Sequence, residues 1–217
     1  MINLSLRSMT STAAAALLLC TLSACSALQP ANVPPSSIYT LDEAATRLSS
    51  TTPAPVAANA PSIIVSTPHA DAGFDSAQMI YVRTAHQLEY FRESQWIKPP
   101  AAMLPPLVVA ALEGSGSFKA VMQAPSIANA DYRLDLEVKR LQQEFFSSPS
   151  QIHFTLRAYL STATSRDIVA WREFDIRIAA PSDDPYGGVV ASNQAVQKVV
   201  ADLAVFCSEA VAGRSKK

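Results

Sequence analysis

The strongest constraint on the fold is an alternation of apolar and polar side chains in three segments of the second half of the chain. Its apolar positions are Tyr132, Leu134, Leu136 and Val138, then Ile152, Phe154, Leu156, Ala158 and Leu160, then Phe174, Ile176 and Ile178. Because successive strand side chains point to opposite faces, this period of two predicts three long strands with one apolar face. Polar turns at 147–150 and 165–167 separate them, so we expect an antiparallel meander.

Three apolar residues fall outside this alternation. Leu141 and Phe145 occupy odd positions after the first run, and Trp171 occupies an odd position in the third. An extra residue in one strand of a pair reverses which positions face inward. The sequence therefore predicts a bulge or register shift in each of these two strands.

Two further segments carry apolar residues at helical spacing. The first contains Met103, Leu104, Leu107, Val108, Ala111 and Leu112 and should end at Gly114. Pro105 and Pro106 fall inside it, so we expect the regular helix to begin or kink there. The second runs over 194–211 and should close at Gly213. An amphipathic helix of this kind would cover the apolar face of the sheet.

The first half of the chain predicts shorter strands at 38–41, 63–65, 78–83 and 86–92. Thr84-Ala85 suggests a tight hairpin between the last two, and the alternation over 87–90 suggests a sheet with one wet face. The expected architecture is a single α+β domain over 62–213, with residues 214–217 as a tail. Its mainly antiparallel sheet with long meander strands would pack against two helices.

The N-terminus indicates the compartment. Arg7 precedes about ten apolar residues at 13–22, too few for a bilayer span of roughly 20, so residues 1–24 are typical of a signal peptide. The following Leu22-Ser23-Ala24-Cys25 resembles a bacterial lipobox, with cleavage after Ala24 and lipid attachment at Cys25. An ordinary secretory signal is the alternative. Ser26 stands where lipoproteins retained in the inner membrane often carry Asp, which points to the outer membrane.

The mature chain would begin with a flexible tether. Residues 25–61 are rich in Pro, Ala, Ser and Thr and interrupted by one short strand at 38–41. Cys20 leaves with the signal and Cys25 is lipidated, so Cys207 remains as the free thiol and no intrachain disulfide can form. The formal charge of -1 provides no basic excess for phosphates, which disfavours nucleic-acid binding.

Residues that could carry chemistry are scattered. His69, His86 and His153 are far apart, and His86 and Glu89 would point to opposite faces of a strand, so we expect no metal site. Ser115 lies in a Gly-Ser-Gly-Ser turn without a nucleophile-elbow frame. We therefore expect no catalytic residues and no cofactor.

The charged face of the first long strand has two interpretations. Its side chains are Arg133, Asp135, Glu137 and Lys139. The two carboxylates could form an acid–base pair, but the alternating basic residues favour a solvated ladder of charges.

Several short motifs carry a family resemblance. They are the runs at 79–83 and 88–90, the Trp-Ile-Lys-Pro-Pro run at 96–100 followed by an aliphatic helix, and the Ile-Tyr-Thr-Leu run at 38–41 after a lipobox. In this order they resemble the ABC-type transport auxiliary lipoprotein family, which includes the lipoprotein partner of the Pqi intermembrane transport system. The resemblance covers roughly residues 39–211.

The resemblance implies a non-enzymatic accessory lipoprotein on the periplasmic face of the outer membrane. Its partners would be an MCE-domain protein with its ABC permease and ATPase, in a system that moves lipids or other hydrophobic molecules; self-association into a homo-oligomer stays open. Tyr90 and Trp96 are the candidate partner-binding residues, because aromatic side chains concentrate binding energy. Packing in the core or at its rim is the alternative for both.

Two other functions remain open. An LptE-like outer-membrane assembly lipoprotein would partner a β-barrel and not an MCE protein. A lipid-anchored hydrolase would require a clustered triad or metal site.

Overall fold

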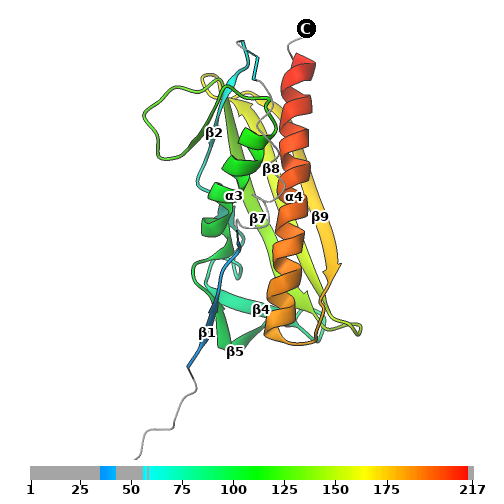
Figure 1. Cartoon of the computed structure of the whole chain (residues 1–217). Helices are drawn as coiled ribbons and strands as arrows, with labels where there is room; N and C mark the ends of the chain where they lie inside the picture. Colours follow the sequence, from blue (N-terminus) through cyan, green and yellow to red (C-terminus); the bar gives the residue numbers. More distant parts are fainter. Residues whose placement is uncertain (1–34, 43–55, 58, 215–217) are drawn as a thin grey trace, which may run out of the picture. The chain divides into compact units, whose positions relative to one another are not determined.

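The computed structural model describes residues 35–42, 56–57 and 59–214, and in this part of the chain a nine-stranded mixed sheet packs against two helices (Figure 1). The strands are β1 Ser37–Tyr39, β2 Ser62–Val65, β3 His69–Ala70, β4 Gln78–Val82, β5 Glu89–Trp96, β6 Ala120–Gln123, β7 Tyr132–Glu144, β8 Gln151–Thr162 and β9 Ile168–Ala179. The helices are α3 Pro100–Gly114 and α4 Pro185–Arg214. The prediction of an α+β domain with a mainly antiparallel sheet is confirmed.

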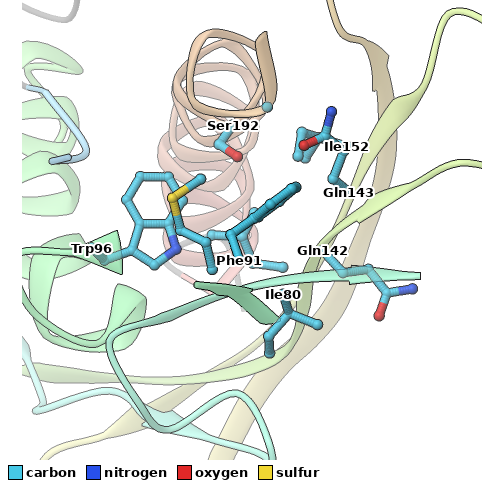
Figure 2. A pocket seen from close by; sticks show the side chains of 10 residues that line it. Ile80, Phe91, Trp96, Gln142, Gln143, Ile152 and Ser192 are labelled. Atoms are coloured by element: carbon cyan, nitrogen blue, oxygen red, sulfur yellow. The ribbon is translucent and has the colours of Figure 1, made fainter. Parts of the chain in front are cut away.

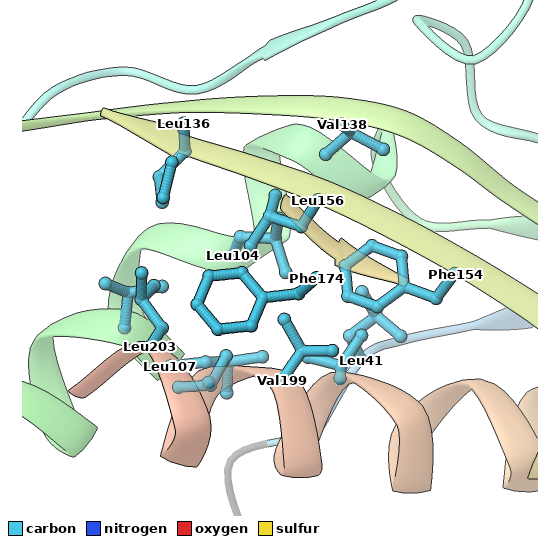
Figure 3. Close-up of a cluster of buried hydrophobic side chains, with 14 of the residues drawn as sticks. Leu41, Leu104, Leu107, Leu136, Val138, Phe154, Leu156, Phe174, Val199 and Leu203 are labelled. Atoms are coloured by element: carbon cyan, nitrogen blue, oxygen red, sulfur yellow. The ribbon is translucent and has the colours of Figure 1, made fainter. Parts of the chain in front are cut away.

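The meander β7–β8–β9 forms as the alternation predicts. Both pairs are antiparallel, with Leu134 opposite Leu160 and Leu156 opposite Phe174. The apolar face is covered by both helices, with α4 running along β8 and β9 (Figure 1). Figure 3 shows the resulting core, where side chains of α3 and α4 meet those of the three long strands.

Three short strands pair in parallel with successive parts of the other edge of β7. The apolar–polar alternation of the sequence did not indicate this arrangement. β2 pairs with the start of β7, β3 with its middle and β4 with its end. β6 lies beside β2, β5 lies antiparallel to β4, and β1 adds a parallel edge strand to β5.

The segment that follows β1 is fastened to α4. The side-chain carbonyl of Asn193 accepts the backbone N–H of Asp42 (2.7 Å), and its amide donates to the carbonyl of Thr40 (3.3 Å). Leu41 between them is 5% exposed and belongs to the core. β1 is thus integrated into the domain although the sequence places it within the tether.

Helix α4 begins at Pro185, nine residues before the predicted start at 194. Its first turn contains two glycines that packing requires: a Cβ on Gly187 would clash with the backbone of Ser182, and one on Gly188 with the Gln143 side chain. The Asp184 carboxylate accepts the N–H of Gly187 (2.7 Å) at this end. The helix is described to Arg214, one residue past the predicted stop at Gly213.

Helix α3 begins at Pro100 and contains Pro105 and Pro106 in its interior, so a start at these prolines is wrong, and a kink there stays a prediction. A proline suits the first helical position because its missing N–H would have no intrahelical partner there. Pro105 is buried in the core and Pro106 faces outward.

The predicted shift in β7 is confirmed. Its register against β8 breaks between Val138 and Arg140, after which odd positions face inward and Leu141 is buried. Phe145 follows the same parity and meets Tyr81 edge-on at a centroid distance of 5.9 Å.

The predicted irregularity in β9 is confirmed, but it lies before Trp171. Leu160 of β8 pairs with Ala170 and Ser161 pairs with Ile168, so β9 contains an extra residue at Val169, and the pairing is unbroken from Trp171 to Ala179. Trp171 therefore remains on the outer face, where it is 61% exposed.

The predicted two-residue hairpin connection at Thr84-Ala85 is wrong, because residues 83–88 join β4 to β5. Thr84 instead opens a β-turn within this connection, closed by a hydrogen bond from the N–H of Gln87 to the carbonyl of Thr84 (3.1 Å). His86 adopts a φ of 68° in this turn and does not lie on a strand.

Candidate functional site

Cys25 and Ala24 lie outside the described residues. Lipid attachment and signal cleavage at these positions therefore stay predictions.

Trp96 is a core residue. It is 4% exposed and lines a cavity of about 10 Å³ with Phe91, Gln143 and Ser192 (Figure 2). Such a volume accommodates about one water molecule, so it excludes an organic ligand. The structure therefore favours the packing interpretation of Trp96, because the buried ring has almost no surface to offer a partner.

Two polar atoms on this cavity are unpaired. Within the described part of the chain, Oε1 of Gln143 and Oγ of Ser192 have no hydrogen-bond partner, although both residues are 1% exposed. The amide nitrogen of Gln143 donates to Oγ of Ser150 (2.9 Å) and to the carbonyl of Asp184 (3.2 Å). The NH₂ group of Gln143 thus links the β7–β8 turn to the start of α4, while its side-chain oxygen makes no hydrogen bond.

Tyr90 is separated from Trp96 by an irregularity in β5. Gln78 of β4 pairs with Gln95, whereas Ile80 pairs with Tyr90, so β5 contains extra residues between these points. The inward positions change parity there: Phe91 packs against the domain, while Tyr90 is 40% exposed. Leu88 and Tyr90, the apolar positions of the alternation over 87–90, are therefore both exposed to solvent.

The outer face of the meander carries the predicted ladder of charges. Arg133 contacts Asp135 (3.0 Å), Lys139 contacts Glu137 (3.2 Å), and Arg157 of β8 contacts Glu173 of β9 (2.6 Å). These side chains are a quarter to two-fifths exposed and neutralise one another. The ladder interpretation is confirmed.

His153 lies at the centre of a buried polar cluster on this same face. The ring is 1% exposed, with Nδ1 2.8 Å from a carboxylate oxygen of Glu144 and Nε2 3.0 Å from Asp175. The guanidinium groups of Arg140 and Arg177 approach Nδ1 to 3.0 and 3.1 Å. Both ring nitrogens are thus engaged within the protein.

The pKa values of the two carboxyl groups in this cluster, Glu144 and Asp175, are both lowered. Burial opposes ionisation of Glu144, but hydrogen bonds from His153 and Gln142 hold its pKa below the usual range. Burial also raises the pKa of Asp175, but the interactions with His153 and the hydroxyl of Thr155 lower it by more. Both carboxylates are therefore ionised at neutral pH and fasten three strands together.

The remaining candidate groups are held in separate places. His69 lies on β3 and His86 in the β4–β5 turn, and no group of three potential metal-ligating side chains occurs among the described residues. Ser115 donates to the carbonyl of Leu112 (2.6 Å) at the end of α3.

Two open grooves on the described surface each have a volume of about 450 Å³. One lies between α3 and the segment after β1, where Ile97 is 60% exposed. The other, which we call the bulge groove, lies over the irregularity in β7. Its lining is Asp71, Ala72, Phe74, Val82, Ala85, His86, Gln87, Leu88, Lys139, Arg140, Gln142 and Phe146.

A family model for the ABC-type transport auxiliary lipoprotein component matches residues 39–204 of this chain. The chain belongs to this family. The match runs from the last residue of β1 through most of α4, so the resemblance of the short motifs is confirmed along nearly the whole domain. Membership identifies the chain as an auxiliary lipoprotein associated with ABC-type transport.

Solved structures share the fold. A protein from Xanthomonas campestris, XCC0632, is 24% identical with a TM-score of 0.69, covering 84% of this chain and 100% of its own. An uncharacterized protein is 14% identical with a TM-score of 0.62, covering 80% of this chain and 99% of its own. No curated protein matches the sequence. Neither helix of the described part combines the length and apolar character needed to cross a bilayer.

Proposed function

We propose that this chain is a periplasmic accessory lipoprotein of an MCE/ABC-type intermembrane transport system for lipids or other hydrophobic molecules, anchored in the outer membrane. In this proposal residues 1–24 are a signal peptide, lipidated Cys25 is the anchor, residues 25–61 include the tether, and residues 62–213 form the body of the domain. The protein acts by docking its partners and performs no catalysis.

The family match over residues 39–204 carries this proposal. The chemistry of the domain supports it, because both nitrogens of His153 and the hydroxyl of Ser115 are committed to internal contacts. A group engaged in this way is poorly placed to act as a base or nucleophile on an external substrate.

The anchor can be tested with a cysteine pair. Cys25→Ser should abolish acylation and leave the precursor attached by its uncleaved signal, whereas Cys207→Ser should mature normally. Mass spectrometry of the mature N-terminus checks both variants. An unmodified Cys25, or cleavage at another bond, would refute the lipoprotein anchor proposed here.

The transport role can be tested by copurification. An affinity-tagged chain, extracted from its own cells in a neutral detergent, should retain the MCE-domain protein and the ABC permease. Deleting its gene should raise sensitivity to membrane-active compounds. A stable complex with a β-barrel in place of the MCE protein would contradict the proposal and favour the assembly role.

A further inference from the structure

The bulge groove owes its charge to the irregularity in β7. Val138 pairs with Leu156 and Arg140 pairs with Thr155, so β7 contains one extra residue at Lys139. In a regular strand these two consecutive cationic residues would point to opposite faces. The bulge brings both into the same groove on the outer face, and bulges commonly redirect side chains next to functional sites.

The two cations differ in their partners. Lys139 is neutralised by Asp71 (2.8 Å) and Glu137 (3.2 Å). No carboxylate in the described part of the chain lies within ion-pair distance of Arg140, whose polar contact is with Nδ1 of His153 (3.0 Å). Arg140 is half-buried and lines the groove, where its guanidinium would bind a carboxylate by charge-assisted hydrogen bonds.

Apolar side chains line the groove beside this cation. Phe146, just after β7, is 57% exposed, and Leu88, from the β4–β5 turn, is 42% exposed. Phe74 contributes a third, half-buried apolar surface from the loop after β3. Three segments far apart in the sequence thus place exposed apolar area next to an unneutralised guanidinium.

The character of the groove favours a peptide over a lipid or a small molecule. Sites for small ligands are mostly apolar and enclose most of their ligand, whereas this groove is open and about half of its lining residues are polar. Mixed polar and apolar surfaces are typical of protein interfaces. Gln87 and Gln142 provide amide groups that can both donate to and accept from a peptide backbone.

We propose that the bulge groove binds a peptide segment of a protein partner in which a carboxylate lies beside a large apolar side chain. The carboxylate pairs with Arg140, and the apolar side chain packs against Leu88 and Phe146. This inference rests on the docking role proposed above and assigns the surface that performs it.

The test is site-specific photocrosslinking of the full-length lipoprotein in its own cells, with benzoylphenylalanine at Leu88, at Phe146 or, as a control of similar exposure outside the groove, at Trp171. Positions 88 and 146 should crosslink to the same protein and position 171 should not. The sequenced partner peptide should contain Asp, Glu or a C-terminal carboxylate adjacent to a large apolar residue.

Charge variants then test the role of Arg140. Arg140→Gln should reduce the crosslinking yield at position 146 about tenfold, the usual scale for losing a charge-assisted contact, and Arg140→Lys should restore part of it. Arg157→Gln, on the same face but outside the groove lining, should leave the yield unchanged. Thermal unfolding midpoints within a few degrees of the parent would exclude misfolding as the cause.

Several outcomes would overturn the proposal: no crosslink at positions 88 and 146, a lipid adduct there, equal capture at position 171, or a yield insensitive to Arg140→Gln. If the crosslinked partner is not the MCE protein, the groove assignment stands and the transport role fails. If the MCE protein copurifies but the groove does not crosslink, only the groove assignment fails.

Discussion

The two faces of β8 are both largely buried near the middle of the strand, but by different means. On the inner face Phe154 and Leu156 are covered by the apolar side chains of the helices. On the outer face His153 and Thr155 are covered by charged side chains of β7 and β9. Inner burial stabilises the domain through the hydrophobic effect, while outer burial depends on groups that must stay ionised and paired. The comparison shows that a low exposure alone does not identify the core.

The largest effect should come from the inner face. Phe154→Ala should lower the free energy of unfolding by about 3–5 kcal/mol, because it opens a cavity in the core beneath α4. Urea denaturation checks this value. A loss as small as that of an exposed residue would show that the helices do not seal the inner face.

The next effect concerns how closely α4 approaches β7. Gly188→Ala would place a methyl group against the side chain of Gln143, and overpacking of this kind typically costs about 1–3 kcal/mol. Gly213→Ala is the matched control, since nothing lies within 4 Å of its added Cβ. The control should stabilise the helix by a few tenths of a kcal/mol up to about 1. Equal effects in the two variants would contradict the close packing.

The dependence of stability on acid pH should differ between variants of the outer face and of the inner face of β8. The folded-state pKa values of Glu144 and Asp175 are lowered, so their contribution is present above the unfolded values near 4 and is lost as pH falls through the folded values. Asp175→Asn should therefore flatten the loss of stability below about pH 5, whereas Phe154→Ala should lower stability equally at all pH values. Thermal midpoints from pH 7 to pH 2 check the contrast. An unchanged slope in Asp175→Asn would exclude a role for this carboxylate in acid unfolding.

The smallest effect should come from the exposed ladder. Arg157→Gln should change the free energy of unfolding by at most about 1 kcal/mol, because its pairs with Glu173 and Glu137 are screened by solvent. The effect should shrink further in high salt. A loss of several kcal/mol would mean that the ladder contributes to stability as the inner core does.

The same contrast explains what the sequence could predict. Period-two alternation identified β7, β8 and β9 because each has one apolar and one charged face. The bulge before Leu141 was visible because an apolar residue changed parity on a strand with a clear pattern. Trp171 pointed to an irregularity that β9 does contain, but the extra residue is Val169 and Trp171 itself lies on the outer face.

Other features depended on pairing between distant segments. The split between Tyr90 and Trp96 arises from the register of β5 against β4, and the first turns of α4 rely on Gly188 meeting Gln143. Neither leaves a periodic signal. The bulge groove is assembled from the loop after β3, the β4–β5 turn and β7, so no local motif could have predicted it.

The attachment of β1 has a mechanical consequence. Tension applied to the chain before Ser37 would enter a strand that runs parallel to β5, with the carbonyl of Tyr39 bonded to the N–H of Ile97 (2.7 Å). A load directed along β1 would act on these bonds as shear, which strains them together and not one at a time. Beyond them the pull reaches Leu41 and the clamp of Asn193 on α4. The domain therefore resists traction from its N-terminal side as a unit, with its longest helix sharing the force.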